Sequence, residues 1–451
     1  MEEDLAMNAQ GKTSRRLVDR PVRIGAEAYV DPDYAREEAE RLWPRVWQVA
    51  CREEELEKPG DYVTYDIVDD SVIVLRSKEG TLRAFHNVCR HRARRLTQGC
   101  GNKARLTCPF HAWSWDLEGQ CIGMTRGEAW GEALGREDVP LLPVQVDTWG
   151  GWVFVNMDLE AAPLADYMGE AATNLAPFAF ETMRYRWRQY LHFPCNWKVA
   201  VEAFNEGYHV AGTHPQLTKF SAKPTWSDAW GLHGVFGSAA REGSGGASSG
   251  AAGAADMREG LKHSLNQLWE EVNATTTQTM VDVANRLPEE LPEGTPAHEV
   301  QMHLMKRTIE EDAKRGVLWP AIDPAHFAKV GNVLHIFPNT VIVHGPVFAL
   351  CYRARPDGTD PNRCIFEVYT LEKFPEGAEP RPDNLYRPEM TEEAWRKVLC
   401  QDFSNMEAVQ QGLRDRAFPG IYPSPEEEKA IVNFHRVLAD YVGRGAPEPI
   451  D

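Results

Sequence analysis

The sequence predicts an α+β protein in which an all-β region precedes a larger region that combines an antiparallel sheet with long helices. The chain has 451 residues, more than one hydrophobic core usually organises, so two domains are expected. Short strand-like runs separated by turns fill residues 60–156, whereas helical and strand patterns mix after residue 158. We expect an N-terminal helical segment at 1–59 that packs on the second domain, a β domain at 60–156 and a mixed domain at 157–451.

The composition restricts the classes of function. A net charge of −18 argues against nucleic acid as a partner, because binding to a duplex depends on neutralising its phosphates. No run approaches the roughly 20 apolar residues that span a bilayer, and the acidic start lacks an apolar signal core. Nine cysteines, an odd number, do not indicate a disulfide framework. We expect a cytoplasmic protein with reduced thiols, in which clustered Cys and His are metal ligands.

The β domain is expected to begin after a helix. Residues 34–50 start in a helical pattern, which Pro44 limits. The following strand-like runs are separated by turns that contain Gly80 and Gly119. These strands are expected at 71–76, 81–88, 104–108, 112–124 and 150–157. Each of two Cys–His pairs then lies at the end of a hairpin.

The mixed domain is expected to contain helices on an antiparallel sheet. The helices are predicted at 198–210, 261–273, 300–316, 391–418 and 426–444. The strands are predicted at 332–345, 347–356 and 363–374. A Gly/Ala/Ser-rich tract at 237–256 does not follow a strand, so it is interpreted as a flexible surface loop and not as a dinucleotide-binding loop.

The two Cys–His pairs have the spacing of a four-ligand metal site. Cys89-x-His91 is followed, sixteen residues later, by Cys108-x-x-His111. Two thiolates and two imidazoles suit Zn²⁺ or a two-iron cluster in which the cysteines hold one iron and the histidines the other. Zinc ribbons favour C-x₂₋₄-C and H-x₃₋₅-H pairs, so a C-x-H start is unusual for zinc. The spacing leaves both metals open.

A second candidate site follows in the mixed domain. Glu202, Glu206 and His209 are spaced i, i+4 and i+7, so a helix would place them on one face. Gly212 ends the regular turns, and His214 can fold back beside His209. Non-haem Fe(II) enzymes bind the metal with two His and one carboxylate, although a pair of this kind can also be structural.

The missing carboxylate can be sought in the helix at 391–418. Its apolar residues follow steps of four and three, and the position that completes the stripe is Asp402. An acid on an apolar seam is paired, protonated or bound to a metal, because burying it alone is costly. The apolar residues of the stripe are Trp395, Leu399, Met406, Val409 and Leu413.

The flanking residues carry a family resemblance. "NVCRHRARRLTQG" and "CPFHAWSWDLEG" resemble the Rieske [2Fe–2S] signature. A second resemblance is carried by N-W-K, then E-x₃-[D/E]-x₂-H-x₄-H, then an acid before "EAVQQGL". It is to the α-subunit of Rieske non-haem iron oxygenases, a family that includes ring-hydroxylating dioxygenases and oxidative demethylases. The resemblance implies a Rieske domain joined to a helix-grip (START/Bet v 1-like) catalytic domain. It implies that Cys89, His91, Cys108 and His111 hold a [2Fe–2S] cluster, and that His209, His214 and Asp402 hold a mononuclear Fe(II).

One position departs from the common family pattern. Where most members carry Asp between the two centres, this sequence has Glu206. The family role of that residue is to bridge a Rieske histidine of one subunit and an iron-binding histidine of the next. The resemblance therefore implies a relay from His111 through Glu206 to His209 in a ring of three subunits, with or without a β-subunit. Glu at this position also occurs in members that act on quaternary amines.

The resemblance implies the terminal oxygenase of a multicomponent system that uses O₂ to hydroxylate an aromatic or other hydrophobic molecule. An oxidative N- or O-demethylase or a quaternary-amine monooxygenase is the alternative; a Rieske electron carrier and a zinc-stabilised binding protein remain further hypotheses. The chain shows no flavin or nicotinamide motif, so electrons from NAD(P)H are expected through a separate reductase or ferredoxin.

The arginines around the first Cys–His pair are either solvated or form a docking patch for that acidic electron donor. These arginines are Arg90, Arg92, Arg94 and Arg95. The substrate pocket is expected to be lined by aromatic residues that include Phe204, Phe220, Trp226, Trp230 and Phe236.

Overall fold

The computed structural model describes residues 16–218, 225–237 and 256–450, which form two compact units. The β unit comprises Ala35–Met168 with Pro356–Asp360, and the mixed unit comprises the remaining described residues. The expected loop at 237–256 lies almost entirely outside the described residues. No helix in the described ranges is long and apolar enough to cross a membrane.

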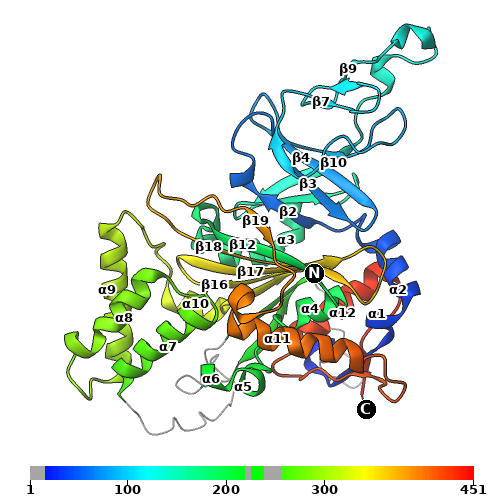
Figure 1. Cartoon of the computed structure of the whole chain (residues 1–451). Coiled ribbons are helices and arrows are strands. Elements are labelled where there is room, and N and C mark those ends of the chain that lie inside the picture. Colours follow the sequence, from blue (N-terminus) through cyan, green and yellow to red (C-terminus); the bar gives the residue numbers. More distant parts are fainter. Residues whose placement is uncertain (1–15, 219–224, 238–255, 451) are drawn as a thin grey trace, which may run out of the picture. The chain divides into compact units, whose positions relative to one another are not determined.

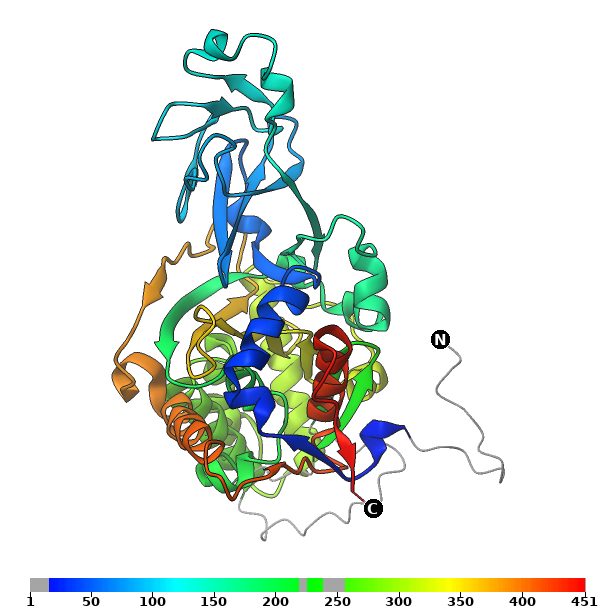
Figure 2. The ribbon, with the colours of Figure 1, turned by 90° about the vertical axis from the view of Figure 1, so that its right-hand side faces the viewer.

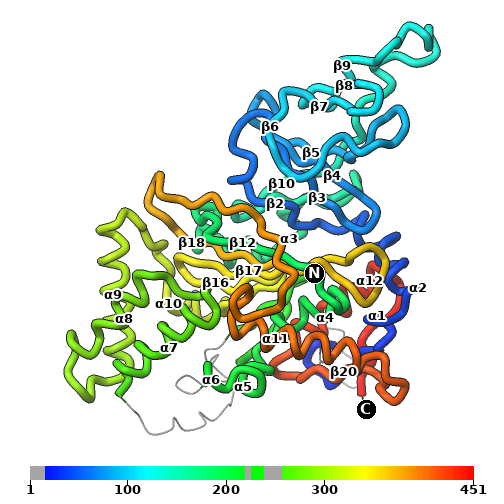
Figure 3. Tube along the Cα trace, viewed as in Figure 1, coloured from blue at the N-terminus to red at the C-terminus, as the bar shows by residue number. Residues whose placement is uncertain are grey.

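The β unit contains a seven-stranded antiparallel sheet with the order β2-β11-β10-β5-β4-β3-β6 and a small sheet β7-β8-β9, which the tube trace in Figure 3 follows. The strands are β2 Gln48–Arg52, β3 Asp61–Ile67, β4 Asp70–Arg76, β5 Leu82–His86, β6 Cys100–Asn102, β7 Leu106–Thr107, β8 Ser114–Trp115, β9 Cys121–Gly123, β10 Pro143–Trp149 and β11 Trp152–Asn156. The strands predicted between residues 71 and 157 are confirmed.

The apolar pattern explains this sheet. Residues 72–75 of β4 are all at most 1% exposed, so this strand is covered on both faces and its sequence is continuously apolar. The turn before β9 requires Gly119, because its φ is +83° and an added Cβ would lie 2.5 Å from the Phe85 ring.

The helix predicted at 34–50 is shorter than expected. It consists of α2 Pro32–Glu37 and a π-helical turn at Glu38–Leu42, and the chain then enters β2. Gln48 fixes the change of direction, since its side-chain amide donates to the Trp43 carbonyl at 2.6 Å. β2 pairs with β11, so the residues from 35 to 59, expected in an N-terminal helical segment, belong to the β unit.

The mixed unit is built on an eight-stranded sheet with the order β13-β14-β15-β16-β17-β18-β12-β19. β12 pairs antiparallel with β18 and parallel with the edge strand β19. The strands are β12 Arg184–Phe193, β13 Trp226–Trp230, β14 His233–Gly237, β15 Val333–Ile336, β16 Thr340–His344, β17 Phe348–Pro356, β18 Cys364–Glu372 and β19 Asn384–Tyr386. The predicted sheet strands between residues 332 and 374 are confirmed.

Two C-terminal helices pack on this sheet. Phe403 of α11 contacts the rings of Phe193 and Phe366, with centroids at 5.0 and 5.9 Å. Phe434 of α12 packs against Phe337 of the β15–β16 turn. The α-helices of the described residues are α1 Glu27–Val30, α2, α3 Leu164–Leu175, α4 Trp197–Glu202, α5 Val210–Thr213, α6 Pro215–Thr218, α7 Met257–Glu271, α8 Gln278–Glu290, α9 Ala297–Lys314, α10 Pro324–Val330, α11 Glu392–Gly412 and α12 Lys429–Val442. A sheet closed over a long helix matches the expected helix-grip arrangement.

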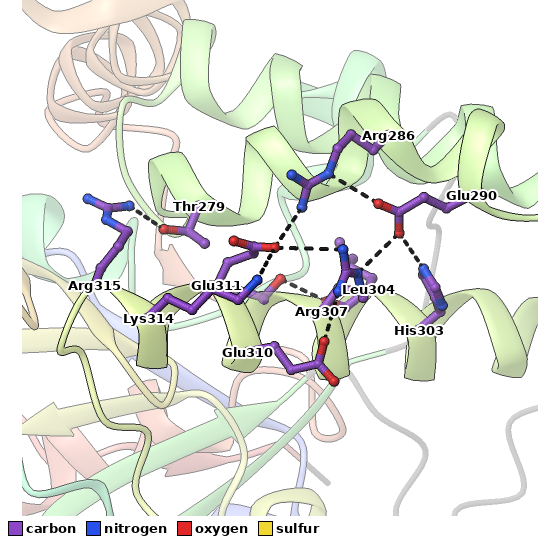
Figure 4. Close-up of polar contacts among 11 residues, drawn as sticks. Thr279, Arg286, Glu290, His303, Leu304, Arg307, Glu310, Glu311, Lys314 and Arg315 are labelled. Atoms are coloured by element: carbon purple, nitrogen blue, oxygen red, sulfur yellow. Dashed lines mark hydrogen bonds and ion pairs between the residues drawn. The ribbon is translucent and has the colours of Figure 1, made fainter.

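Helices α7, α8 and α9 form a bundle at one end of the sheet (Figure 1). The sequence did not indicate α3 or α8, and Pro288 lies inside α8. Charged side chains join α8 to α9: Glu290 pairs with His303 at 2.7 Å and with Arg307 at 3.3 Å, and Arg286 lies between Glu290 and Glu311 (Figure 4). These contacts surround a small apolar core.

The first and last described segments meet in a small sheet. The strand β1 Val22–Gly25 lies between β20 Gly420–Ile421 and β21 Glu448–Pro449, and Figure 2 shows β1 in blue beside the red β21. The described residues 16–34 therefore belong to the mixed unit.

Candidate metal centres and adjoining cavities

The two Cys–His loops of the β unit share one backbone geometry. In each loop the amide four residues after the cysteine donates to the cysteine carbonyl, at 3.0 Å for Cys89 and 2.9 Å for Cys108. Each cysteine amide donates to the carbonyl five residues further on, at 2.8 Å in both loops. Ala93 and Ala112 have φ values of +56° and +59° in these turns. A positive φ is uncommon for non-glycine residues and carries a conformational cost.

The four predicted side chains of this site lie together. Cys89 and Cys108 are 4% and 1% exposed, and their side chains are in hydrogen-bond contact. The rings of His91 and His111 are 4.6 Å apart, and Trp113 stacks on His91 at 4.9 Å. The Nδ1 atom of His91 is buried without a hydrogen-bond partner in the part of the chain that the structure describes. An orphaned imidazole nitrogen beside two buried thiols fits a metal cluster, because buried polar atoms otherwise find partners.

The protonation of these groups follows from burial. Burial is the main reason why the pKa of the Cys89 thiol is raised; the backbone amide of His91 opposes the shift, and Cys108 adds to it. Burial, followed by the nearby His111, lowers the pKa of His91. A neutral imidazole can bind a metal directly, whereas the thiols must lose their protons to do so.

The second predicted site is also assembled. His209, His214 and Asp402 each offer a ligand atom, and these atoms lie within 4.8 Å of one another. The Nε2 atom of His214 is 2.8 Å from Oδ1 of Asp402, and Nε2 of His209 is 3.7 Å from the same oxygen. The two histidines flank α5, and the aspartate comes from α11. Two imidazoles and a carboxylate that converge in this way fit the ligand set of a non-haem iron.

The helix predicted at 198–210 does not continue to His209. It ends as α4 at Glu202, and a turn precedes α5. Asn205 is fully buried and bonds to His335 of β15, and Glu206 accepts the His209 backbone N–H at 2.9 Å. These tertiary contacts replace the helical hydrogen bonds, so the expected shared face of Glu202, Glu206 and His209 is wrong.

Glu202 lies outside the ligand set. It accepts hydrogen bonds from Tyr29 at 2.9 and 3.0 Å and pairs with His435 at 2.7 Å. All three residues belong to the mixed unit, so Glu202 links α1, α4 and α12. Its contacts are those of a structural carboxylate.

Both imidazoles of the second site are held through their Nδ1 atoms. Nδ1 of His209 lies 2.5 Å from Oε1 of Glu206, and Nδ1 of His214 lies 2.9 Å from Oε1 of Gln401. The sequence pattern did not indicate Gln401. Burial acts to lower the pKa of His209, but the hydrogen bond and charge of Glu206, followed by the charge of Asp402, outweigh it and the pKa is raised.

The stripe that predicted Asp402 is largely buried. Asp402 is 5% exposed, and its neighbours Leu399 and Met406 are each 2% exposed. Val409, at 46% exposed, is the exception. The last residue of the stripe, Leu413, is again buried at 4% exposed, so the stripe stays buried apart from Val409.

A cavity of about 620 Å³ adjoins the second site, and His209, His214 and Asp402 lie in its wall. Phe204 stacks on Tyr352 at 3.8 Å in this wall, and Phe236 also lines the cavity. The expected lining residues Trp226 and Trp230 do not line it, and Phe220 lies outside the described residues. The lining within the described ranges contains three carboxylates and no Lys or Arg; the carboxylates are Glu206, Asp402 and Glu427.

A second cavity of about 250 Å³ shares Glu206, His209 and Asp402 with the first, so the site forms the partition between the two. Glu428 also lines this second cavity. Burial, which outweighs a backbone hydrogen bond, raises the pKa of Glu428 to about 7, and the charges of Glu206 and Glu202 add to the shift. Both cavities are lined mainly by apolar side chains, and the second cavity adds the carboxylates of Glu202 and Glu428 to the shared Glu206 and Asp402.

Two family models match the chain. A model of the ring-hydroxylating alpha subunit (catalytic domain) matches residues 180–444, and a model of the Rieske [2Fe–2S] domain matches residues 46–135. The first match covers all three residues of the second site, and the second covers both Cys–His loops.

Characterised relatives include mono- and dioxygenases. The chain is 33% identical to the carnitine monooxygenase oxygenase subunit of Acinetobacter pittii over 190 residues, or 42% of this chain and 51% of that protein. It is 34% identical to the biphenyl 2,3-dioxygenase subunit alpha of Rhodococcus jostii over 213 residues, or 45% of each. The matched part of the chain thus spans about half the length of these relatives. A crystal structure of the quaternary ammonium Rieske monooxygenase CntA with L-carnitine has the same fold, with a TM-score of 0.63 at 19% identity over 94% of this chain and 97% of that one.

Proposed function

This chain belongs to the family of ring-hydroxylating alpha subunits with a Rieske [2Fe–2S] domain, and we propose that it is the terminal oxygenase of a multicomponent Rieske system. It uses O₂ and externally supplied electrons to hydroxylate a small molecule. The observation that carries the proposal is the buried meeting of His209, His214 and Asp402 in the wall of a cavity large enough for a small substrate.

We propose that each metal group has its own ligand set. Cys89, His91, Cys108 and His111 hold the [2Fe–2S] cluster, and the second-site triad holds Fe(II). When bound, the cluster supplies single electrons and the iron activates O₂. The protein residues orient these groups: Trp113 packs over His91, and Glu206 fixes the ring of His209 through Nδ1. The walls of the larger cavity hold the substrate beside the triad and exclude water.

We propose that Glu206 also receives electrons from another subunit. It would contact His111 of the partner subunit while it holds His209 of its own, in a head-to-tail homotrimer with or without a β-subunit. The two Glu206 oxygens already accept the Nδ1–H and the backbone N–H of His209. Each carboxylate oxygen has a further lone pair, so a third hydrogen bond remains available.

We propose a cytoplasmic location and a separate ferredoxin or flavin reductase as electron donor, so that NAD(P)H acts only through that protein. The arginines around the first centre could receive an acidic donor. Arg92 lies over the Phe110 ring at 5.5 Å, and Arg95 pairs with Asp66 at 3.0 Å on the surface. Exposed pairs of this kind contribute little to stability, so these side chains can exchange partners.

The apolar walls favour an aromatic or other hydrophobic substrate. The alternative, an N- or O-demethylase or a quaternary-amine monooxygenase, is favoured by the Phe204–Tyr352 stack and Phe236 beside Glu427, since aromatic rings and carboxylates both attract organic cations. The relatives include enzymes for both classes. A panel of arenes, aromatic acids and methylated amines, scored by O₂ uptake and product, separates the two.

Metal analysis tests the proposal. An oxygenase of this type binds about three irons per chain, whereas a Rieske electron carrier binds about two. We expect a red-brown protein with about three irons whose turnover disappears when His209 and His214 are both replaced by alanine. Turnover that survives this double substitution would contradict the proposal.

A further inference from the structure

The two histidines of the mononuclear site have different partners. Glu206, a carboxylate, lies 2.5 Å from Nδ1 of His209, whereas Gln401, a neutral amide, lies 2.9 Å from Nδ1 of His214. His214 is 2% exposed, so water does not compete for its ring nitrogens. The orientation of the His214 ring therefore depends on the protein groups around it.

The direction of the hydrogen bonds defines the state of His214. Nε2 of Gln216 donates to Oε1 of Gln401 at 2.7 Å, and the same oxygen faces Nδ1 of His214. A carbonyl oxygen can only accept, so Nδ1 of His214 carries the proton. In the neutral ring Nε2 then carries the lone pair and can bind a metal, and it lies 2.8 Å from Oδ1 of Asp402, another ligand atom of the proposed site.

The orienting group and a ligand come from the same place in the chain. Gln401 directly precedes Asp402 on α11, while Gln216 follows His214 at the start of α6. His214 and Gln401 are 187 positions apart in the sequence, and the Oε1 atom of Gln401 brings their two segments into contact. A shift of α11 that moved Asp402 would also move the group that orients His214.

We propose that Gln401, braced by Gln216, is a positioning residue that fixes the tautomer and ring orientation of His214 for metal binding. The inference rests on the proposed function, in which His214 binds iron. Partners of the outer ring nitrogen usually contribute about 10–100-fold to metal affinity or activity. An amide does this without adding a third carboxylate to a site that already holds Asp402 and Glu206.

Co(II) binding to the metal-depleted mononuclear site of the full-length protein tests this inference. Calorimetric titration measures the affinity, and the visible absorption of Co(II) reports the geometry of its ligands. Gln401→Leu should weaken Co(II) binding about 10–100-fold and alter the spectrum, and Gln216→Leu should weaken it by a smaller factor. Gln401→Glu keeps an acceptor in place and should restore the affinity to at least the wild-type level.

Two controls separate positioning from a general effect. Gln411→Leu places the same change on an exposed residue of α11 and should leave the affinity unchanged. The melting temperature of the metal-free protein should be similar in all variants. If Gln401→Leu does not fold, Gln401→Asn, whose amide is one methylene too short, should show the same loss.

The outcomes are distinct. If His214→Ala abolishes Co(II) binding but Gln401→Leu keeps the wild-type affinity, the positioning role is overturned. A loss of affinity in Gln401→Leu that Gln401→Glu does not restore would overturn it as well. If His214→Ala binds Co(II) like the wild type, the proposed function fails and this inference with it.

Discussion

Replacement of His344 by phenylalanine should stabilise the mixed unit and reduce its sensitivity to acid. His344 is 2% exposed, and neither of its ring nitrogens has a hydrogen-bond partner within the described ranges of the chain. The rings of Phe178, Phe180 and Phe327 surround it, with centroids at 4.4, 5.5 and 6.4 Å. A buried polar group without a partner costs about 1–3 kcal/mol, and phenylalanine removes that cost in an aromatic environment.

The expected gain depends on pH. Burial lowers the pKa of His344 from 6.5 to about 3. The unfolded chain therefore binds a proton below about pH 6.5 that the folded protein does not bind until about pH 3, so stability falls as the pH decreases through this window. From pH 8 to pH 5 this amounts to about 2 kcal/mol. With a gain of about 1–2 kcal/mol at pH 8, after allowance for the larger ring, the advantage of the variant should reach about 3–4 kcal/mol at pH 5.

Calorimetric melting at pH 8 and pH 5 measures both effects. A change of 1 kcal/mol shifts the melting temperature of a domain of this size by about 2–3 °C, so His344→Phe should lose several degrees less than the wild type on acidification. His335, whose pKa burial also lowers to about 3, remains in the variant, so some acid sensitivity should persist. His298→Phe, at a side chain 72% exposed, is the matched control. An equal loss in His344→Phe and wild type would refute the reasoning.

Three variants test the proposed sites. Asp402→Ala should lower the iron content from about three to about two per chain and leave the cluster absorption intact, and an unchanged content would exclude Asp402 as a ligand. Glu206→Gln should retain the cluster but slow turnover about 10–100-fold, measured as reoxidation of the reduced cluster under O₂; wild-type reoxidation would rule out its role. Reversal of Arg94 and Arg95 to Glu should slow reduction of the cluster by its donor and weaken the salt dependence of that rate, whereas unchanged kinetics would exclude the docking patch.

The residues of the two proposed metal sites could be predicted from the sequence because metal chemistry restricts both residue type and spacing. Cys89 and Cys108 stand in turns whose length and strand context repeat, and the structure shows the same backbone hydrogen bonds in both. Asp402 was predictable because an acid interrupts a buried apolar stripe, and the structure confirms its burial at 5% exposed. In each case a local pattern carried the chemical information.

The interruption of the helix after Glu202 could not be predicted, because its cause is tertiary. Residues 198–210 have a helical pattern, but Asn205 bonds to His335, which lies 130 positions away in β15. An added Cβ at Gly207 would lie 2.6 Å from the Thr225 side chain, so the chain passes too close there for most side chains. Gln401 was missed for a related reason: an amide on a helix surface has no distinctive pattern until its partner His214 is placed.

The interrupted helix and the length of Glu206 explain each other. On a continuous helix, Glu206 would project from the same face as His209 and could not accept both its ring N–H and its backbone N–H, as it does at 2.5 and 2.9 Å. The turn brings the carboxylate back onto the residue three positions ahead. We expect an aspartate, which is one methylene shorter, to make fewer of these contacts at the same lengths.

This arrangement places Glu206 in the wall shared by the two cavities, with the larger cavity of about 620 Å³ on one side and the smaller cavity with Glu428 on the other. If substrate occupies the larger cavity, an electron donor can approach His209 through Glu206 from the side of the smaller cavity without displacing it. Blocking the smaller cavity should therefore slow electron delivery and leave substrate affinity unchanged. Introduction of a bulky side chain at Ala203, which lines only the smaller of the two cavities, tests this separation: reoxidation of the cluster should slow while the Kd for substrate stays constant. A parallel loss of substrate binding would show that the two cavities do not act independently.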